Sequence, residues 1–163
     1  MTHLRSASLA FALSFLALPA ASQEITLGLG VTDFSESGDD SAVFDFEYRH
    51  ASFFERRRFS AAFGVNASVS AEGDLFIGAG LWNRVQFDNG VFIDSSIMPG
   101  FYEEGTAGND LGQTFEIRSL LGVGYKFDNG RAISAAIAHK SNAGLSDDNP
   151  GANSYSIRYH ISF

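Results

Sequence analysis

The chain has 163 residues, a formal net charge of −8, 17 glycines, 16 phenylalanines and no cysteine. This length is typical of one domain, and the lack of cysteine excludes disulfide scaffolds, thiol nucleophiles and cysteine-based zinc sites. The acidic balance argues against nucleic acid as a partner, and a mean hydropathy near zero argues against a bundle of transmembrane helices. A membrane β-barrel remains compatible with these values, because its apolar residues occupy only alternate positions.

The first 22 residues have the pattern of a secretory signal peptide. Arg5 provides a positive start, an apolar stretch runs from Leu9 to Leu18, and small residues follow up to Ser22. The apolar stretch is too short to cross a bilayer as a helix. We therefore predict cleavage near Ala21 or Ser22, a mature domain over residues 23–163, and export from the cytoplasm. The alternative is a buried N-terminal helix.

Beyond residue 22 the sequence alternates between apolar and polar residues, which is the period of a β-strand. No later stretch reaches the roughly 18 apolar residues that a transmembrane helix needs. Eight segments show the alternation, and the last ends in the aromatic Phe163, as is typical of bacterial outer-membrane barrels. The segments are residues 25–31, 44–49, 59–68, 75–84, 91–97, 115–127, 133–137 and 155–163.

The strands of a soluble β-sandwich would also alternate between apolar and polar residues. The composition of the polar faces therefore distinguishes a sandwich from a membrane barrel. These faces carry charges of both signs together with glycines and serines. A narrow closed barrel needs such a filled, charge-paired interior and an apolar outside that faces lipid. We therefore predict an all-β fold, an eight-stranded antiparallel transmembrane β-barrel of the outer-membrane type.

The connections between segments predict how this barrel lies in the membrane. The sequence Phe87–Gly90 recurs as Phe127–Gly130, and its Asn-Gly pair predicts a tight hairpin, because both residues tolerate positive φ. Short turns of such barrels lie on the periplasmic side and longer loops lie outside. The connection from His50 to Arg58 also falls on the periplasmic side.

The predicted outer loops are acidic. We interpret their carboxylates as a solvated surface, with divalent-cation binding as the alternative. The residues are Asp33, Glu36, Asp39, Asp40, Glu103, Glu104, Asp110, Asp147 and Asp148.

Two residues near the end of the seventh segment point to chemistry. His139 and Ser141 are two positions apart, so on a strand they share the face of Ile133, Ala135 and Ile137, which is the lipid-facing one. Polar groups are costly on that face. A histidine base can take the proton of a serine hydroxyl, whose oxygen can then attack an ester. The pair predicts a serine esterase that acts on a lipid ester in the outer leaflet.

The residues from His139 to Gly144, the later Asn149-Pro150-Gly151 and the alternating end of the chain resemble the C-terminal motif of PagL-type lipid A 3-O-deacylases. These are eight-stranded outer-membrane esterases that remove the acyl chain at position 3 of lipid A. The resemblance implies a bacterial outer-membrane location and lipid A, or lipopolysaccharide, as the partner. The specific match covers only about the last thirty residues.

The resemblance also implies roles for individual residues. Ser141 corresponds to the nucleophile and His139 to the base, whereas Asn142 and Gly144 correspond to the oxyanion hole. The family places a glutamate twelve residues after the serine, and here that position is Asn153. An amide can fix the tautomer of the histidine, but it stabilises the imidazolium less than a carboxylate does. We therefore expect a slower enzyme.

Several alternatives remain open at this point. Asp147 or Asp148 could replace the missing carboxylate, or the site could have decayed to leave a non-enzymatic structural or adhesin-like barrel. A homodimer is not excluded. We expect no cofactor and no metal centre, because His50, His139 and His160 show no paired-ligand spacing. His160 is expected to point into the barrel. The chain also lacks the Gly-x-Ser-x-Gly elbow of α/β-hydrolases.

Overall fold

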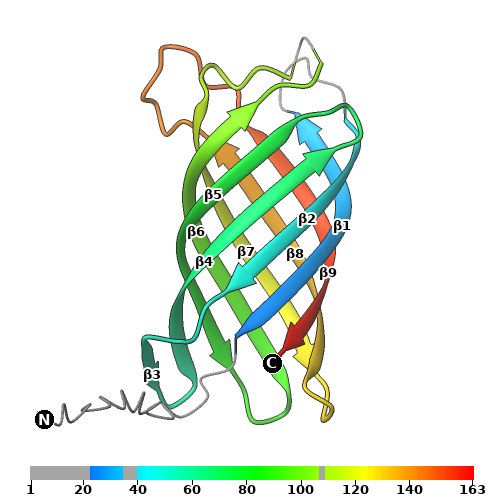
Figure 1. The fold of residues 1–163 in the computed structure, drawn as a ribbon, viewed down its shortest axis with the longest axis vertical. Helices are drawn as coiled ribbons and strands as arrows, with labels where there is room; N and C mark the ends of the chain where they lie inside the picture. The colour runs from blue at the N-terminus through cyan, green and yellow to red at the C-terminus, as the bar shows by residue number, and fades with distance from the viewer. Residues whose placement is uncertain (1–22, 35–39, 107–108) are drawn as a thin grey trace, which may run out of the picture.

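The computed structural model describes residues 23–34, 40–106 and 109–163, so the predicted signal peptide (residues 1–22) lies outside the described residues. Within the described ranges, no helix is long and apolar enough to cross a membrane. These ranges instead contain nine antiparallel strands (Figure 1). The strands are β1 (Glu24–Phe34), β2 (Ala42–Arg49), β3 (Phe54–Arg56), β4 (Phe59–Ser70), β5 (Leu75–Gln86), β6 (Val91–Glu103), β7 (Phe115–Lys126), β8 (Arg131–Ser141) and β9 (Ala152–Ser162).

Eight of these strands close into a barrel, as the sequence predicts. Each pairs with its neighbour along the chain, β1 pairs with β9, and β2 pairs with β4 across the short connection that holds β3. The strand β3 pairs only with the start of β4 and extends the wall at one end. Three residues are too few to show a strand period, so the sequence does not predict this strand.

The alternation of each strand separates an apolar outside from a polar inside. Leu29, Phe63, Ile97, Leu121 and Ile157 are among the large apolar side chains exposed around the barrel. A continuous apolar exterior is the surface that a membrane barrel presents to lipid.

Ion pairs fill the interior. Arg84 donates to Glu24 at 2.9 Å and to Asp94 at 2.7 Å, and all three side chains are buried. Two residues further along β1, opposite Thr26, Glu47 accepts from Arg158 at 2.7 Å. The prediction of a filled interior with paired charges is confirmed. Because buried charges are costly when unpaired, these pairs tie the strands into one register.

The two ends of the barrel differ in the length of their connections. The connections 87–90 and 127–130 lie at the same end as the C-terminus, which we name the turn end (Figure 1). The longer connections, including residues 104–114 and 142–151, lie at the other end, which we name the loop end. This arrangement matches the predicted division into short turns and longer loops.

Both Asn-Gly sites form the tight hairpins that the sequence predicts, and only the glycine of each pair takes positive φ. Among the described non-glycine residues only Arg57 and Ala143 have positive φ, so Asn89 and Asn129 do not. Gly90 has a φ of 87°, and its N–H donates to Phe87 O at 3.2 Å. Each turn is therefore a type I turn followed by a glycine bulge, because only the glycine is free of a Cβ clash at positive φ.

Candidate active site

The outward row of β8 ends in two polar residues at the loop end. This row continues from Ile137 to His139 and Ser141, whereas Ala138 and Lys140 between them are buried inside the barrel. His139 is exposed and Ser141 is half-buried. The structure therefore brings both residues to the lipid-facing side, where the sequence period places them.

His139 is hydrogen-bonded to the neighbouring strand. The register of β8 and β9 sets His139 directly opposite Asn153, and the distance from His139 Nδ1 to Asn153 Oδ1 is 2.9 Å. An amide oxygen only accepts, so Nδ1 carries the proton and Nε2 holds the free lone pair. This is the tautomer that a general base needs. Within the described residues, no hydrogen bond joins the Ser141 hydroxyl to His139.

A glycine supports the imidazole from the loop side. Gly151 has a φ of 70°, and a Cβ built on it would lie 3.0 Å from Cε1 and 3.5 Å from Nε2 of His139. The ring therefore lies close against the backbone of Gly151. The sequence motif contained this glycine without indicating its contact, since the contact depends on how the 142–151 loop folds back onto β8.

The residues after Ser141 form a tight turn with an unusual backbone. Leu145 N–H donates to Asn142 O at 3.1 Å, and the central residues Ala143 and Gly144 have φ values of 55° and 75°. A positive φ costs free energy at alanine because of its Cβ. Strain of this kind concentrates at functional sites, where the surrounding structure holds it in place.

Asn142 is fully buried beneath this turn and ties two loops together. Its Nδ2 donates to Leu111 O at 3.2 Å and to Asp148 O at 2.7 Å, while its Oδ1 accepts from Gly144 N–H at 3.0 Å. Both donors predicted for the oxyanion hole are thus engaged in the loop. Ala143 N–H is the donor of this turn that has no hydrogen-bond partner among the described residues.

The acidic loop residues do not complete the pair. Asp148 meets Asn142 through its backbone oxygen, and within the described part of the chain neither Asp147 nor Asp148 has a carboxylate hydrogen bond to His139. Glu36 and Asp39 of the acidic surface lie outside the described residues. Among the described residues, no group of three or more histidine, aspartate or glutamate side chains could hold a metal ion. The interpretation as a solvated surface, with cation binding as its alternative, stays a prediction.

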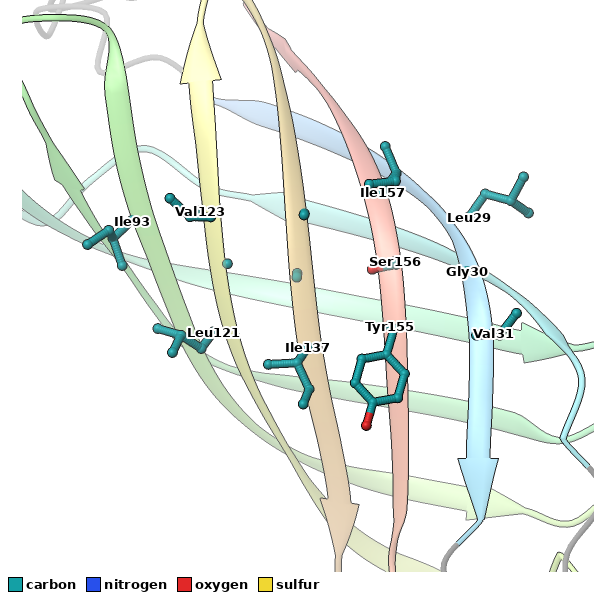
Figure 2. Close-up of a pocket in the computed structure, with 13 residues that line it drawn as sticks. Leu29, Gly30, Val31, Ile93, Leu121, Val123, Ile137, Tyr155, Ser156 and Ile157 are labelled. Carbon is teal, nitrogen blue, oxygen red and sulfur yellow. The ribbon is translucent and has the colours of Figure 1, made fainter.

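An apolar groove of about 700 Å³ lies on the outer face of the barrel (Figure 2). Its lining begins two residues along β8 and β9 from the pair His139 and Asn153. Ile137 and Tyr155 are paired across β8 and β9 at its near end, and both point outward. The groove continues between Leu121 and Ile157, where the small side chain of Ala135 leaves room between the larger ones. A groove with this lining offers an apolar chain a surface that leads to the histidine.

A second histidine has richer contacts but no access. His160 points into the barrel, as predicted, and is fully buried. Its Nε2 lies 2.8 Å from Ser134 Oγ, and its Nδ1 lies 2.9 Å from Glu24 Oε1 and 3.0 Å from Thr26 Oγ1. This buried cluster, Ser134–His160–Glu24, has the connectivity of a catalytic triad, yet a substrate has no path to it through the packed interior.

Comparison with known proteins agrees with the family resemblance of the sequence motif. A family model described as lipid A 3-O-deacylase (PagL) matches residues 43–162. The lipid A deacylase PagL of Pseudomonas aeruginosa is 35% identical over 71 residues, which is 43% of this chain and 41% of that protein. The aligned region therefore spans about two fifths of the length of that relative.

Solved structures share the fold. The crystal structure of the outer membrane enzyme PagL matches with a TM-score of 0.70 at 20% identity, covering 85% of this chain and 98% of that chain. The crystal structure of Neisserial surface protein A matches with a TM-score of 0.58 at 11% identity, covering 87% and 96%. A designed transmembrane β-barrel gives 0.59 at 8% identity, covering 88% and 96%. These structural matches show the barrel fold. At identities of 20% or less they do not show the chemistry, which depends on the residues of the site.

Proposed function

The chain belongs to the lipid A 3-O-deacylase family (PagL), and from that premise we propose that it is an outer-membrane serine esterase that removes an ester-linked (3-O) acyl chain from lipid A. One observation carries the proposal. A histidine with its Nδ1 held by Asn153 stands two residues from Ser141 on the lipid-facing row, at the loop end of an apolar groove. Structural histidines are satisfied inside the barrel, as His160 is.

The reaction follows from the roles that these atoms can take. His139 Nε2 accepts the proton of Ser141 as its Oγ forms a bond to the ester carbonyl carbon. The tetrahedral intermediate collapses, the bond to the sugar oxygen breaks, and the imidazolium returns the proton to that oxygen. Water then attacks the acyl-enzyme with His139 again as base, which releases the fatty acid and restores Ser141. Separated serine and histidine side chains are usual in a free enzyme and draw together on binding.

The turn after Ser141 supplies the oxyanion donors in this proposal. The sequence predicts Asn142 and Gly144 for this role; their N–H groups are engaged within the loop, and the N–H of Ala143, which has no partner among the described residues, lies between them in the same turn. The buried amide of Asn142 supports these groups by fixing the turn to two loop carbonyls. Donors held in place before the reaction stabilise the developing charge without reorganisation.

The apolar groove supports a lipid with an acyl chain as the substrate. Its lining is apolar, and its near end at Ile137 lies on the same outward row of β8 as His139 and Ser141, so an acyl chain in the groove points its ester toward that pair. The groove opens sideways on the barrel wall, where an outer-leaflet lipid enters without leaving the membrane. No cofactor is required by this chemistry.

Mass spectrometry of lipid A tests the proposal. Cells that make the wild-type chain should contain lipid A lacking one ester-linked acyl chain, and cells that make Ser141→Ala should contain the complete form. Heat-modifiable migration on gels confirms that each barrel is folded. An identical acyl pattern with two folded proteins would instead support the non-enzymatic barrel, in which the change to Asn153 accompanies loss of activity.

A further inference from the structure

Three polar residues form a row across the outer face at the loop end. The register of β1 and β9 sets Asp33 directly opposite Asn153, and that of β9 and β8 sets Asn153 directly opposite His139. Residues directly opposite in an antiparallel pair project on the same face, with Cβ atoms about 5 Å apart. The row therefore reads Asp33, Asn153, His139 across three adjacent strands.

The carboxylate of Asp33 leans toward β9. Its Oδ2 accepts from the hydroxyl of Tyr155 at 3.4 Å, and Tyr155 is two residues from Asn153 on the same face. Figure 2 shows Tyr155 on the outer face of β9, beside Val31, which precedes Asp33 by two positions on β1. Asp33 is half-buried, and its backbone is paired directly with that of Asn153.

This position answers two weaknesses of an asparagine as the partner of the histidine. An amide has an acceptor end and a donor end, and either can face the imidazole unless a neighbour selects one. An amide is also neutral, so by itself it adds little to the stability of the imidazolium. A carboxylate at the facing position of β1 would address both, because a negative charge there attracts the donor end of the amide and favours the imidazolium.

We propose that Asp33 is a positioning residue for His139 that acts through Asn153, and this inference rests on the proposed esterase function. Its carboxylate faces Asn153 from the opposite position on β1, and its charge favours the amide orientation in which Nδ2 points toward β1 and Oδ1 toward His139 Nδ1–H. Its negative charge stabilises the imidazolium formed when Ser141 loses its proton. The carboxylate that the family has at position 153 is thus supplied here from the next strand.

A double-mutant cycle tests this assignment with purified barrels in detergent, lipid A as substrate and released fatty acid as the readout. Asp33→Asn in the wild-type chain should lower kcat about tenfold, the size expected for one charge about 10 Å away at a protein surface, and leave KM within about twofold. Asp33→Asn in an Asn153→Glu background should leave kcat unchanged or raise it, because the introduced carboxylate then meets His139 directly and Asp33 only repels that carboxylate.

Glu104→Gln is the matched control, since Glu104 is an exposed carboxylate of the loop end outside the row. The Glu104→Gln variant should keep kcat within about twofold of the wild type. Its kcat measures how much the loss of any carboxylate at the loop end changes the rate. Equal losses from Asp33→Asn in both backgrounds, or no loss in the wild-type chain, would overturn the inference while leaving the esterase intact. A folded wild-type chain that releases no fatty acid would overturn the proposed function and this inference with it.

Discussion

The inside and the outside of the barrel each hold a serine, a histidine and a third polar residue, and the two sets differ in an instructive way. Inside, Ser134 and Glu24 bond both ring nitrogens of His160, and every member is buried. Outside, His139 has Asn153 on Nδ1, while Ser141 is half-buried on the lipid-facing side and makes no hydrogen bond to His139. The better-connected set is structural, and the less connected set is the candidate site. Access to substrate, rather than hydrogen-bond connectivity, separates them.

Removing the outer serine should have the largest effect on activity. Ser141→Ala should lower kcat at least about 10³-fold, because loss of a nucleophile removes the covalent route altogether. Its free energy of unfolding should change by less than about 0.5 kcal/mol, since Ser141 makes no hydrogen bond that a core depends on. Released fatty acid and urea titration measure the two. A large loss of stability would place Ser141 among the structural residues.

The inner carboxylate should show the opposite profile. Glu24→Ala removes the carboxylate that Arg84 and Arg49 share in the buried interior, and breaking such pairs costs about 3–5 kcal/mol. Urea unfolding should show this loss, while the folded fraction keeps its kcat. Selective loss of kcat in a stable barrel would mean that the inner set takes part in the reaction.

A small shift of the His139 imidazole should be enough to lower kcat. Gly151→Ala puts a Cβ 3.0 Å from His139 Cε1, and misplacement of a catalytic group by a fraction of an ångström costs about tenfold or more in kcat. Gly130→Ala is the control, because Gly130 has a similar φ of 78° and nothing within 4 Å of its added Cβ. Equal kcat in the two variants would contradict a role for the contact between Gly151 and the His139 ring.

The inner serine should give the smallest effect. Ser134→Ala leaves His160 Nε2 without its partner, and an unsatisfied buried group costs about 1–3 kcal/mol. Activity of the folded protein should stay within about twofold of the wild type. Thermal or urea unfolding measures the change in the free energy of unfolding, and the release of fatty acid measures kcat. A loss comparable with that of Ser141→Ala would reverse the assignment of the two sets.

Much of this contrast could be predicted from sequence because strand periodicity is local. A period of two residues fixes which side chains point out, so His139, Ser141 and Asn153 fall on the outer face and His160 on the inner one. The closed barrel follows from the same period, together with the charges that alternate with the apolar residues.

Features that depend on register between distant strands could not be predicted. Asp33 looked like one acidic loop residue among several, and only the pairing of β1 with β9 sets it opposite Asn153. Interior aromatics were missed for a related reason. Phe76 points inward because Gly78 and Gly100 leave space for its ring from two strands. Such matching of large and small residues has no signal within a single strand.

Covalent labelling of the folded wild-type barrel with a fluorophosphonate, followed by peptide mass spectrometry, tests the outer site most directly. Such a reagent captures a serine only where a base activates it and a reagent can reach it. We predict a single adduct on Ser141, with the reaction abolished in His139→Gln. An adduct on Ser134, or an unlabelled Ser141 in a barrel that still deacylates lipid A, would contradict the assignment of the outer site.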